Sequence, residues 1–139
     1  MRPSVVALAV VMAATPSLPV SMASAVGGYT IKVTCTVPKH QPQRQLAPDS
    51  CLNYVPDGTQ TYTARVVTAA GRPAVGLSVS WTDSDTKDAN FRIPQNPCRT
   101  DANGQCSAEV RDTHPRAGEK LTLTATAGGS SANGYLTFK

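Results

Sequence analysis

Four cysteines carry the most distinctive chemistry in this chain. Cys35, Cys51, Cys98 and Cys106 are potential ligands of a metal ion or partners in disulfide bonds. A structural zinc site needs close pairs such as C-x-x-C, whereas the closest pair here is separated by seven residues. An even number of cysteines in a small exported chain predicts two disulfides instead, with three possible pairings. The pairing of Cys35 with Cys51 and Cys98 with Cys106 is favoured, because each pair encloses a short segment rich in proline and turn residues.

A hydrolytic site is the second chemistry to consider, because Asp112-Thr113-His114 and scattered serines supply the residue types of a catalytic triad. The chain lacks the G-x-S-x-G motif that exposes a nucleophilic serine. His40 and His114 also stand alone, without the spacing of metal ligands. The sequence therefore predicts no catalytic residue and no enzyme.

Three aspartates follow the only tryptophan and suggest a calcium loop. Asp83, Asp85 and Asp88 supply oxygen ligands, but the segment lacks the glycine and the closing glutamate of an EF-hand. Aspartate is also common in turns, because it bonds to its own backbone. The sequence predicts no metal site and no cofactor.

Residues 38–50 form the most promising binding segment, which we call the stapled segment. Three prolines stiffen it, and a disulfide between Cys35 and Cys51 would tie its ends together. Lys39, His40 and Arg44 make it a candidate partner-binding loop for an acidic or phosphate-bearing partner. Long connections in compact domains are often functional, and the alternative is a solvated spacer.

The chain begins with the features of a secretory signal. Arg2 precedes an apolar run at residues 5–14, and Ala23-Ser24-Ala25 offers the small residues that signal peptidase reads. We expect a Sec-type signal at residues 1–25, cleavage after Ala25, a secreted mature domain at residues 26–139 and no membrane span in that mature chain. With 139 residues and a net charge of +4, the chain is too short for a TIM barrel, and it has no basic run for nucleic acid.

Most of the remaining chain alternates apolar and polar residues. Successive side chains of a β-strand point to opposite faces, so this alternation predicts strands with one buried face. About seven short strands separated by turn signals predict an all-β fold, an antiparallel β-sandwich. The expected strands start near residues 29, 61, 75, 90, 106, 121 and 135. Residues expected in the core are Tyr62, Val66, Val79, Trp81, Leu121, Leu123 and Phe138.

Several motifs resemble bacterial Ig-like domains of the invasin/intimin type. Residues 62–81 (YTARVVTAAGRPAVGLSVSW) resemble the family's hairpin, and residues 100–105 (TDANGQ) match its turn. The segment 121–129 (LTLTATAGG) after Ala117-Gly118, and Pro56-Asp57-Gly58 before Tyr62, fit the same pattern. The resemblance covers roughly residues 54–138. The chain differs from the usual pattern of this family in three ways. It has a single copy of the domain, it has cysteines on both sides of the turn, and its stapled segment is longer.

This resemblance implies an Ig-like sandwich that acts as a secreted binding or adhesion module without catalysis. Its partner would be an unidentified protein or a component of the cell surface or cell wall, and its oligomeric state is not predicted. The alternative is a secreted, disulfide-stapled protease inhibitor. In that case Cys98-Arg99, within the sequence NPCRT, would belong to a rigid reactive loop.

Overall fold

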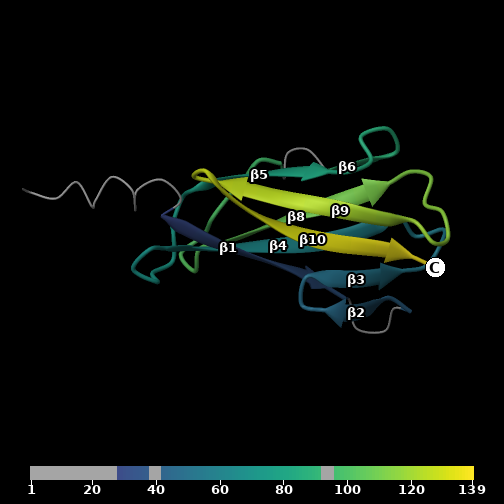
Figure 1. The fold of residues 1–139 in the computed structure, drawn as a ribbon, viewed down its shortest axis with the longest axis horizontal. Coiled ribbons are helices and arrows are strands. Elements are labelled where there is room, and N and C mark those ends of the chain that lie inside the picture. The colour runs from purple at the N-terminus through teal and green to yellow at the C-terminus, as the bar shows by residue number, and fades with distance from the viewer. Residues whose placement is uncertain (1–27, 38–41, 92–95) are drawn as a thin grey trace, which may run out of the picture.

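A computed structural model describes residues 28–37, 42–91 and 96–139. The expected export signal, Lys39 and His40 lie outside these residues. The described chain forms ten strands and no helix, arranged as two packed sheets (Figure 1). The strands are β1 (Tyr29–Thr36), β2 (Arg44–Ala47), β3 (Ser50–Asn53), β4 (Thr59–Thr68), β5 (Ser78–Asp83), β6 (Ala89–Phe91), β7 (Cys98–Arg99), β8 (Gln105–Asp112), β9 (Lys120–Ala127) and β10 (Ser130–Phe138).

The two sheets confirm the predicted all-β sandwich. One sheet has four strands in the order β1-β4-β8-β6, and the other has six in the order β2-β3-β10-β9-β5-β7. Neighbouring strands are antiparallel except β3 and β10, which run parallel. The prediction of about seven strands was too low, because it missed the short strands β2, β3 and β7.

The core lies between the sheets and contains the residues that the alternation selected. All seven predicted core residues are buried, and Trp81 is only 2% exposed. The ring centroids of Trp81 and Phe91 lie 5.4 Å apart. The indole N–H of Trp81 donates to the sulfur of Cys98 at 3.3 Å. The only tryptophan therefore packs in the core and also has a polar partner.

The turn at residues 100–105 shows why its sequence is so specific. Asp101 Oδ1 accepts the backbone N–H groups of Asn103 at 2.8 Å and Gln105 at 3.0 Å. Gly104 has φ +72°, and a Cβ there would lie 2.4 Å from the carbonyl oxygen of Val66. Glycine is required at this position by both the backbone conformation and the close approach of β4.

One predicted strand begins later than expected. The alternation from Val75 to Trp81 predicted a strand from residue 75, but β5 begins at Ser78. Gly76 has φ +70°, and its N–H and that of Leu77 donate to the backbone and the hydroxyl of Thr100. These bonds hold residues 76 and 77 against the turn rather than in a sheet. The weaker strand expected at residues 90–93 corresponds to β6, and residues 92 and 93 lie outside the described chain.

No helix in the described ranges is long and apolar enough to cross a membrane.

Candidate functional site

Both predicted disulfides are present, and each joins one sheet to the other. Cys35–Cys51 links β1 at the edge of the four-stranded sheet to β3, with a Cα–Cα distance of 6.2 Å. Cys98–Cys106 links β7 at the edge of the six-stranded sheet to β8, with a Cα–Cα distance of 5.9 Å. The disulfides therefore hold two sheet edges against the opposite layer.

The stapled segment is more ordered than the open connection that the sequence predicted. Its residues 44–47 form β2, which pairs with β3 and makes the outer edge of the six-stranded sheet (Figure 1). Gln43 is buried, and its side-chain amide donates to Asp57 Oδ2 at 2.7 Å. The Gln45 amide donates to the carbonyl oxygens of Cys35 at 3.1 Å and Pro48 at 3.2 Å. These bonds and the disulfide fix the segment to the sandwich along its described length.

Only one of the three predicted binding residues can be placed. Arg44 is exposed on β2, and Lys39 and His40 lie outside the described chain. Leu46, on the same strand, is 58% exposed. The sequence analysis did not select Leu46, because a single leucine in a polar segment carries no periodicity. Arg44 and Leu46 thus present a charged and an apolar side chain on one short edge strand.

A groove lies beside the turn that joins β2 to β3. It has a volume of about 570 Å³ and lies between residues 31–34 of β1, Pro48 and Asp49 of the turn, and Ala132, Asn133 and Tyr135 of β10. β3 pairs with β10 only along residues 135–138, so β10 has no pairing partner on that side over residues 130–134 in the described structure. The groove therefore occupies the place where a longer β3 would continue.

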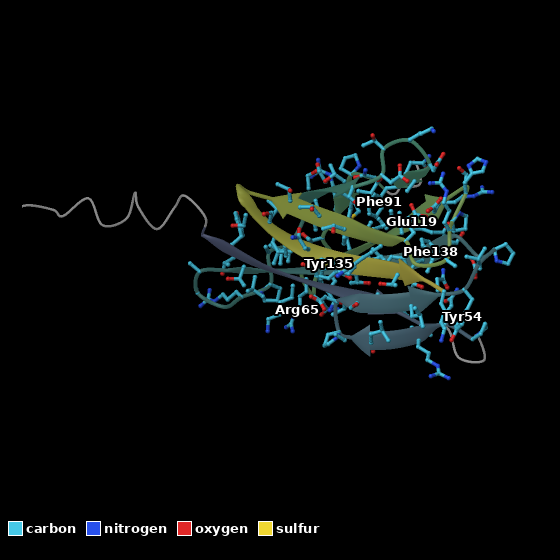
Figure 2. All side chains as sticks on the ribbon, turned by 45° about the vertical axis from the view of Figure 1, so that its right-hand side comes forward. Tyr54, Arg65, Phe91, Glu119, Tyr135 and Phe138 are labelled. Atoms are coloured by element: carbon cyan, nitrogen blue, oxygen red, sulfur yellow. A yellow bond between two sulfur atoms is a disulfide. The ribbon has the colours of Figure 1, made fainter. Side chains whose placement is uncertain are left out.

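Aromatic and charged groups shape the groove near Tyr135, which Figure 2 labels. The Tyr62 hydroxyl donates to the carbonyl oxygen of Tyr135 at 2.6 Å. Burial, with a smaller contribution from the Asp49 carboxylate, raises the pKa of Tyr62 far above its usual value, so this hydroxyl stays protonated as a donor. The Lys120 ammonium lies 4.7 Å from the centroid of the Tyr135 ring. A Cβ at Gly134 would lie 2.8 Å from a methyl group of Val33 and 3.0 Å from the Tyr62 ring, so a larger residue would force these side chains to shift.

The residues considered for a catalytic triad meet in an arrangement that does not form one. His114 Nδ1 lies 3.0 Å from the Thr113 hydroxyl and 3.5 Å from Asp88 Oδ1. A triad needs the nucleophile and the acid on different ring nitrogens, whereas here both contact the same nitrogen. The Asp112 carboxylate instead accepts the backbone N–H of His114 at 2.8 Å, and the imidazole is exposed. The cluster acts as a polar surface contact.

The aspartate loop after Trp81 is organised by backbone hydrogen bonds. Asp85 Oδ1 accepts the N–H groups of Lys87 at 3.1 Å and Asp88 at 3.2 Å. Asp83 Oδ1 and Asp112 Oδ2 are buried and have no hydrogen-bond partner among the residues that the structure describes. Within residues 28–37, 42–91 and 96–139, no three His, Cys, Asp or Glu side chains are placed to hold a metal ion.

Asp83 and Asp85 are expected to change stability with pH in opposite directions. Burial, followed by repulsion from Asp85, raises the pKa of Asp83 above 3.8. The stabilising contribution of Asp83 is therefore complete below pH 3.8 and lost as the pH rises through its folded pKa. The backbone N–H groups of Asp88 and Lys87 lower the pKa of Asp85. Its contribution is present above pH 3.8 and lost as the pH falls through its folded pKa.

Denaturant unfolding of two variants tests these opposite signs. Asp83→Asn should be more stable than wild type near pH 7, and its advantage should vanish in acid. Asp85→Asn should be less stable near pH 7, and its deficit should shrink in acid. Equal pH profiles for the two variants would contradict the assignment.

The proposed inhibitor residues are built into the sheet. Cys98 and Arg99 form β7, in which Arg99 pairs with Ser78 of β5. The Arg99 guanidinium donates to the carbonyl oxygen of Gly76 at 3.0 Å. An inhibitor's reactive loop presents its side chain outward to the protease, whereas Arg99 is bonded to its own domain.

Comparison with known families accounts for this architecture. Residues 53–139 match the family described as bacterial Ig-like domain (group 1). The chain belongs to this family. As an Ig-like domain with two disulfides, it is a module of the extracellular type, since such bonds persist in oxidising compartments. The matched range begins at the last residue of β3, so β1 and the stapled segment lie outside it. The groove is therefore lined partly by residues of β10 inside the matched range and partly by residues of β1 and the stapled segment outside it.

One solved structure similar to this Ig-like chain is the crystal structure of the S-layer protein SbsC domains 4 and 5. The similarity has a TM-score of 0.49 at 14% sequence identity, and it covers 84% of this chain and 79% of that one. No curated protein matches the chain.

Proposed function

We propose that this Ig-like chain is an exported, non-catalytic binding or adhesion module that contacts its partner through the stapled segment and the adjoining groove. The observation that carries the proposal is the groove itself, which has walls from both sheets and a disulfide-anchored turn on one side. Loops and edges on a rigid sandwich are the usual place for recognition in such folds. Export would use the signal at residues 1–25, with cleavage after Ala25.

The anchoring of the stapled segment supports a binding role. The hydrogen bonds of Gln43 and Gln45 and the Cys35–Cys51 disulfide fix the segment to the sandwich. A surface that is already ordered loses less conformational entropy when it meets a partner. The exposed Arg44 gives this fixed strand a positive charge, and Lys39 and His40 precede it in the sequence. The partner proposed is therefore an acidic or phosphate-bearing component of the cell surface.

A charge-removal variant of the stapled segment tests the proposed function. Replacing Lys39, His40 and Arg44 with serine should weaken binding of the labelled protein to intact cells and cell-wall fractions, most strongly at low salt. Its stability should change by less than about 0.5 kcal/mol. The matched control replaces Arg72 and Lys87, exposed residues of two other loops, with serine, because it removes the same full charge.

Binding by the control variant should match wild type at every salt concentration. If the triple variant and the control bind equally, the stapled segment is a spacer and the proposed function is wrong.

Protease inhibition remains the competing function, and no observation favours it. Incubation of the chain with trypsin-like and subtilisin-like proteases separates the two, because a binding module should leave their activity unchanged. Inhibition lost in Arg99→Ala would establish the competing function instead.

A further inference from the structure

The middle of β1 has a backbone edge beside which the described part of the chain places no strand. β1 is the longest edge strand of the two sheets, and its residues pair with β4 on one side only. The Cys35 N–H points away from β4 and donates to Pro48 O at 2.9 Å. The Tyr29 carbonyl also points away and accepts the Ser130 hydroxyl at 2.8 Å. Since the direction of the backbone groups alternates along a strand, the N–H and C=O groups of Ile31 and Val33 must also point away from β4, although their side chains are buried.

The outward N–H and C=O groups of Ile31 and Val33 have no hydrogen-bond partner in the described chain. Both residues line the groove, so these groups border open space. Each end of the edge is covered, by the Ser130 hydroxyl or by the stapled segment, and only this middle stretch is left free. A free edge of this kind is a template for an added strand.

The opposite wall of the groove is also a strand edge. The Tyr135 N–H points toward β3 and donates to Asp49 O at 2.8 Å. By the same alternation, the backbone groups of Asn133 point to that side, where β3 does not reach. The Asn133 side chain is already held by the Thr124 hydroxyl at 2.9 Å. Main-chain groups therefore border the groove on both walls, and such groups suit another main chain.

The side chains around this edge carry positive charge. Lys32 is exposed between Ile31 and Val33, and its cross-strand neighbour on β4 is Arg65. Tyr135 and Arg65 flank the β1 ribbon in the view of Figure 2. Lys120 lies over the Tyr135 ring, and Asp49 supplies the only carboxylate among the residues that line the groove. An added strand would place every second side chain on the face that carries Lys32, with one of them opposite Lys32, so acidic residues are favoured on that face.

We propose that an extended acidic peptide segment of a partner protein adds as a strand to β1 in this groove. Its backbone would bond to Ile31 and Val33, its acidic residues would lie beside Lys32, and its alternate apolar residues would enter the groove. The inference rests on the proposed binding function and names the partner chemistry of the same site.

A second copy of the chain fits this edge less well. Two β1 edges paired around a two-fold axis at Lys32 would set two lysines directly opposite each other, and like charges in that position are destabilising. Lysine on an edge strand is a common protection against such self-pairing. The lysine that disfavours a second copy favours an acidic strand.

Synthetic peptides test the proposal directly. The probe is a ten-residue peptide whose central positions alternate valine and glutamate. One control replaces its glutamates with lysine, and the other carries N-methyl groups on the central amides. With the full chain, NMR shifts should be confined to the groove, and saturating probe should slow amide exchange of Ile31 and Val33 by about tenfold or more. Neither control peptide should produce these changes.

Two pairs of variants identify the backbone and charge contributions. Val33→Pro removes the outward N–H but no bond to β4, and it should weaken the probe by about tenfold. Val33→Ala keeps that N–H and should bind nearly as wild type does. Lys32→Glu should weaken the probe by about fivefold at low salt. Arg72→Glu, which changes net charge equally in the turn between β4 and β5, outside the groove lining, should leave binding unchanged.

Several results would overturn the proposal. These are shifts outside the groove, equal binding of the N-methylated or lysine peptide, equal effects within either pair of variants, or concentration-dependent self-association through β1. Folding of Val33→Pro is checked separately, and the Lys32→Glu comparison decides the outcome if that variant unfolds. If the peptide fails but cell binding still depends on the stapled segment, only this inference is lost. If the peptide binds but the triple variant of the stapled segment binds cells as wild type does, the proposed function is wrong and this inference stands.

Discussion

Replacing Trp81 with alanine is expected to lower the free energy of unfolding by about 3 to 5 kcal/mol. The indole is 2% exposed and packs against Phe91, with ring centroids 5.4 Å apart. Its removal would leave a cavity between the sheets and would also leave the sulfur of Cys98 without its N–H donor. Both losses occur where β5 meets the opposite layer, so the surrounding strands have little freedom to collapse.

Denaturant unfolding followed by circular dichroism measures this loss, because the variant lacks the only tryptophan as a fluorescent reporter. Thr82→Ala is the matched control, since Thr82 is the next residue on β5 and its side chain is exposed. It should change stability by less than about 0.5 kcal/mol. A loss below about 1 kcal/mol for Trp81→Ala would show that the indole does not support the core.

Removing the Cys35–Cys51 disulfide should be the second large effect. The bond closes a segment with a sequence separation of 16, and the chain-entropy relation gives about 3 kcal/mol for such a loop. The double variant Cys35→Ala, Cys51→Ala loses this contribution to the free energy of unfolding and also the covalent bond between β1 and β3. The groove depends on that bond, because the turn at Pro48 and Asp49 forms one of its walls. We therefore expect weaker binding of the acidic peptide at temperatures where the variant is still folded.

The second disulfide provides the comparison. Cys98–Cys106 has a sequence separation of 8, so the double variant Cys98→Ala, Cys106→Ala should lose a little less, about 2.5 kcal/mol. Because this bond lies away from the groove, peptide binding should survive its removal. Thermal unfolding and peptide titration of both double variants measure the two effects. Equal loss of peptide binding in the two variants would contradict a specific role for the Cys35–Cys51 bond.

The sequence alone was sufficient for the strands that face the core. In β8 and β9 every second residue is buried, and β4 follows this pattern up to Val66. Apolar letters mark these buried positions in TQTYTARVVT, QCSAEVRD and KLTLTATA, except at the buried polar residues Gln60 and Asp112. This pattern is local and depends only on the two faces of a strand. The pairing of the cysteines was also predictable, because each pair encloses a short segment. Trp81 and the other core residues followed from the same alternation.

The site depended on tertiary structure. β2 has four exposed residues and no apolar alternation, so nothing in RQLA distinguishes a strand from a loop. Its strand geometry comes from pairing with β3, which itself pairs in parallel with the last strand of the chain. The groove exists because β3 begins only at Ser50, beside Tyr135, whereas β10 already starts at Ser130. Those lengths are set by contacts between residues far apart in sequence, so the sequence determined the composition of the sandwich, and only its folding decided which backbone edges remained free.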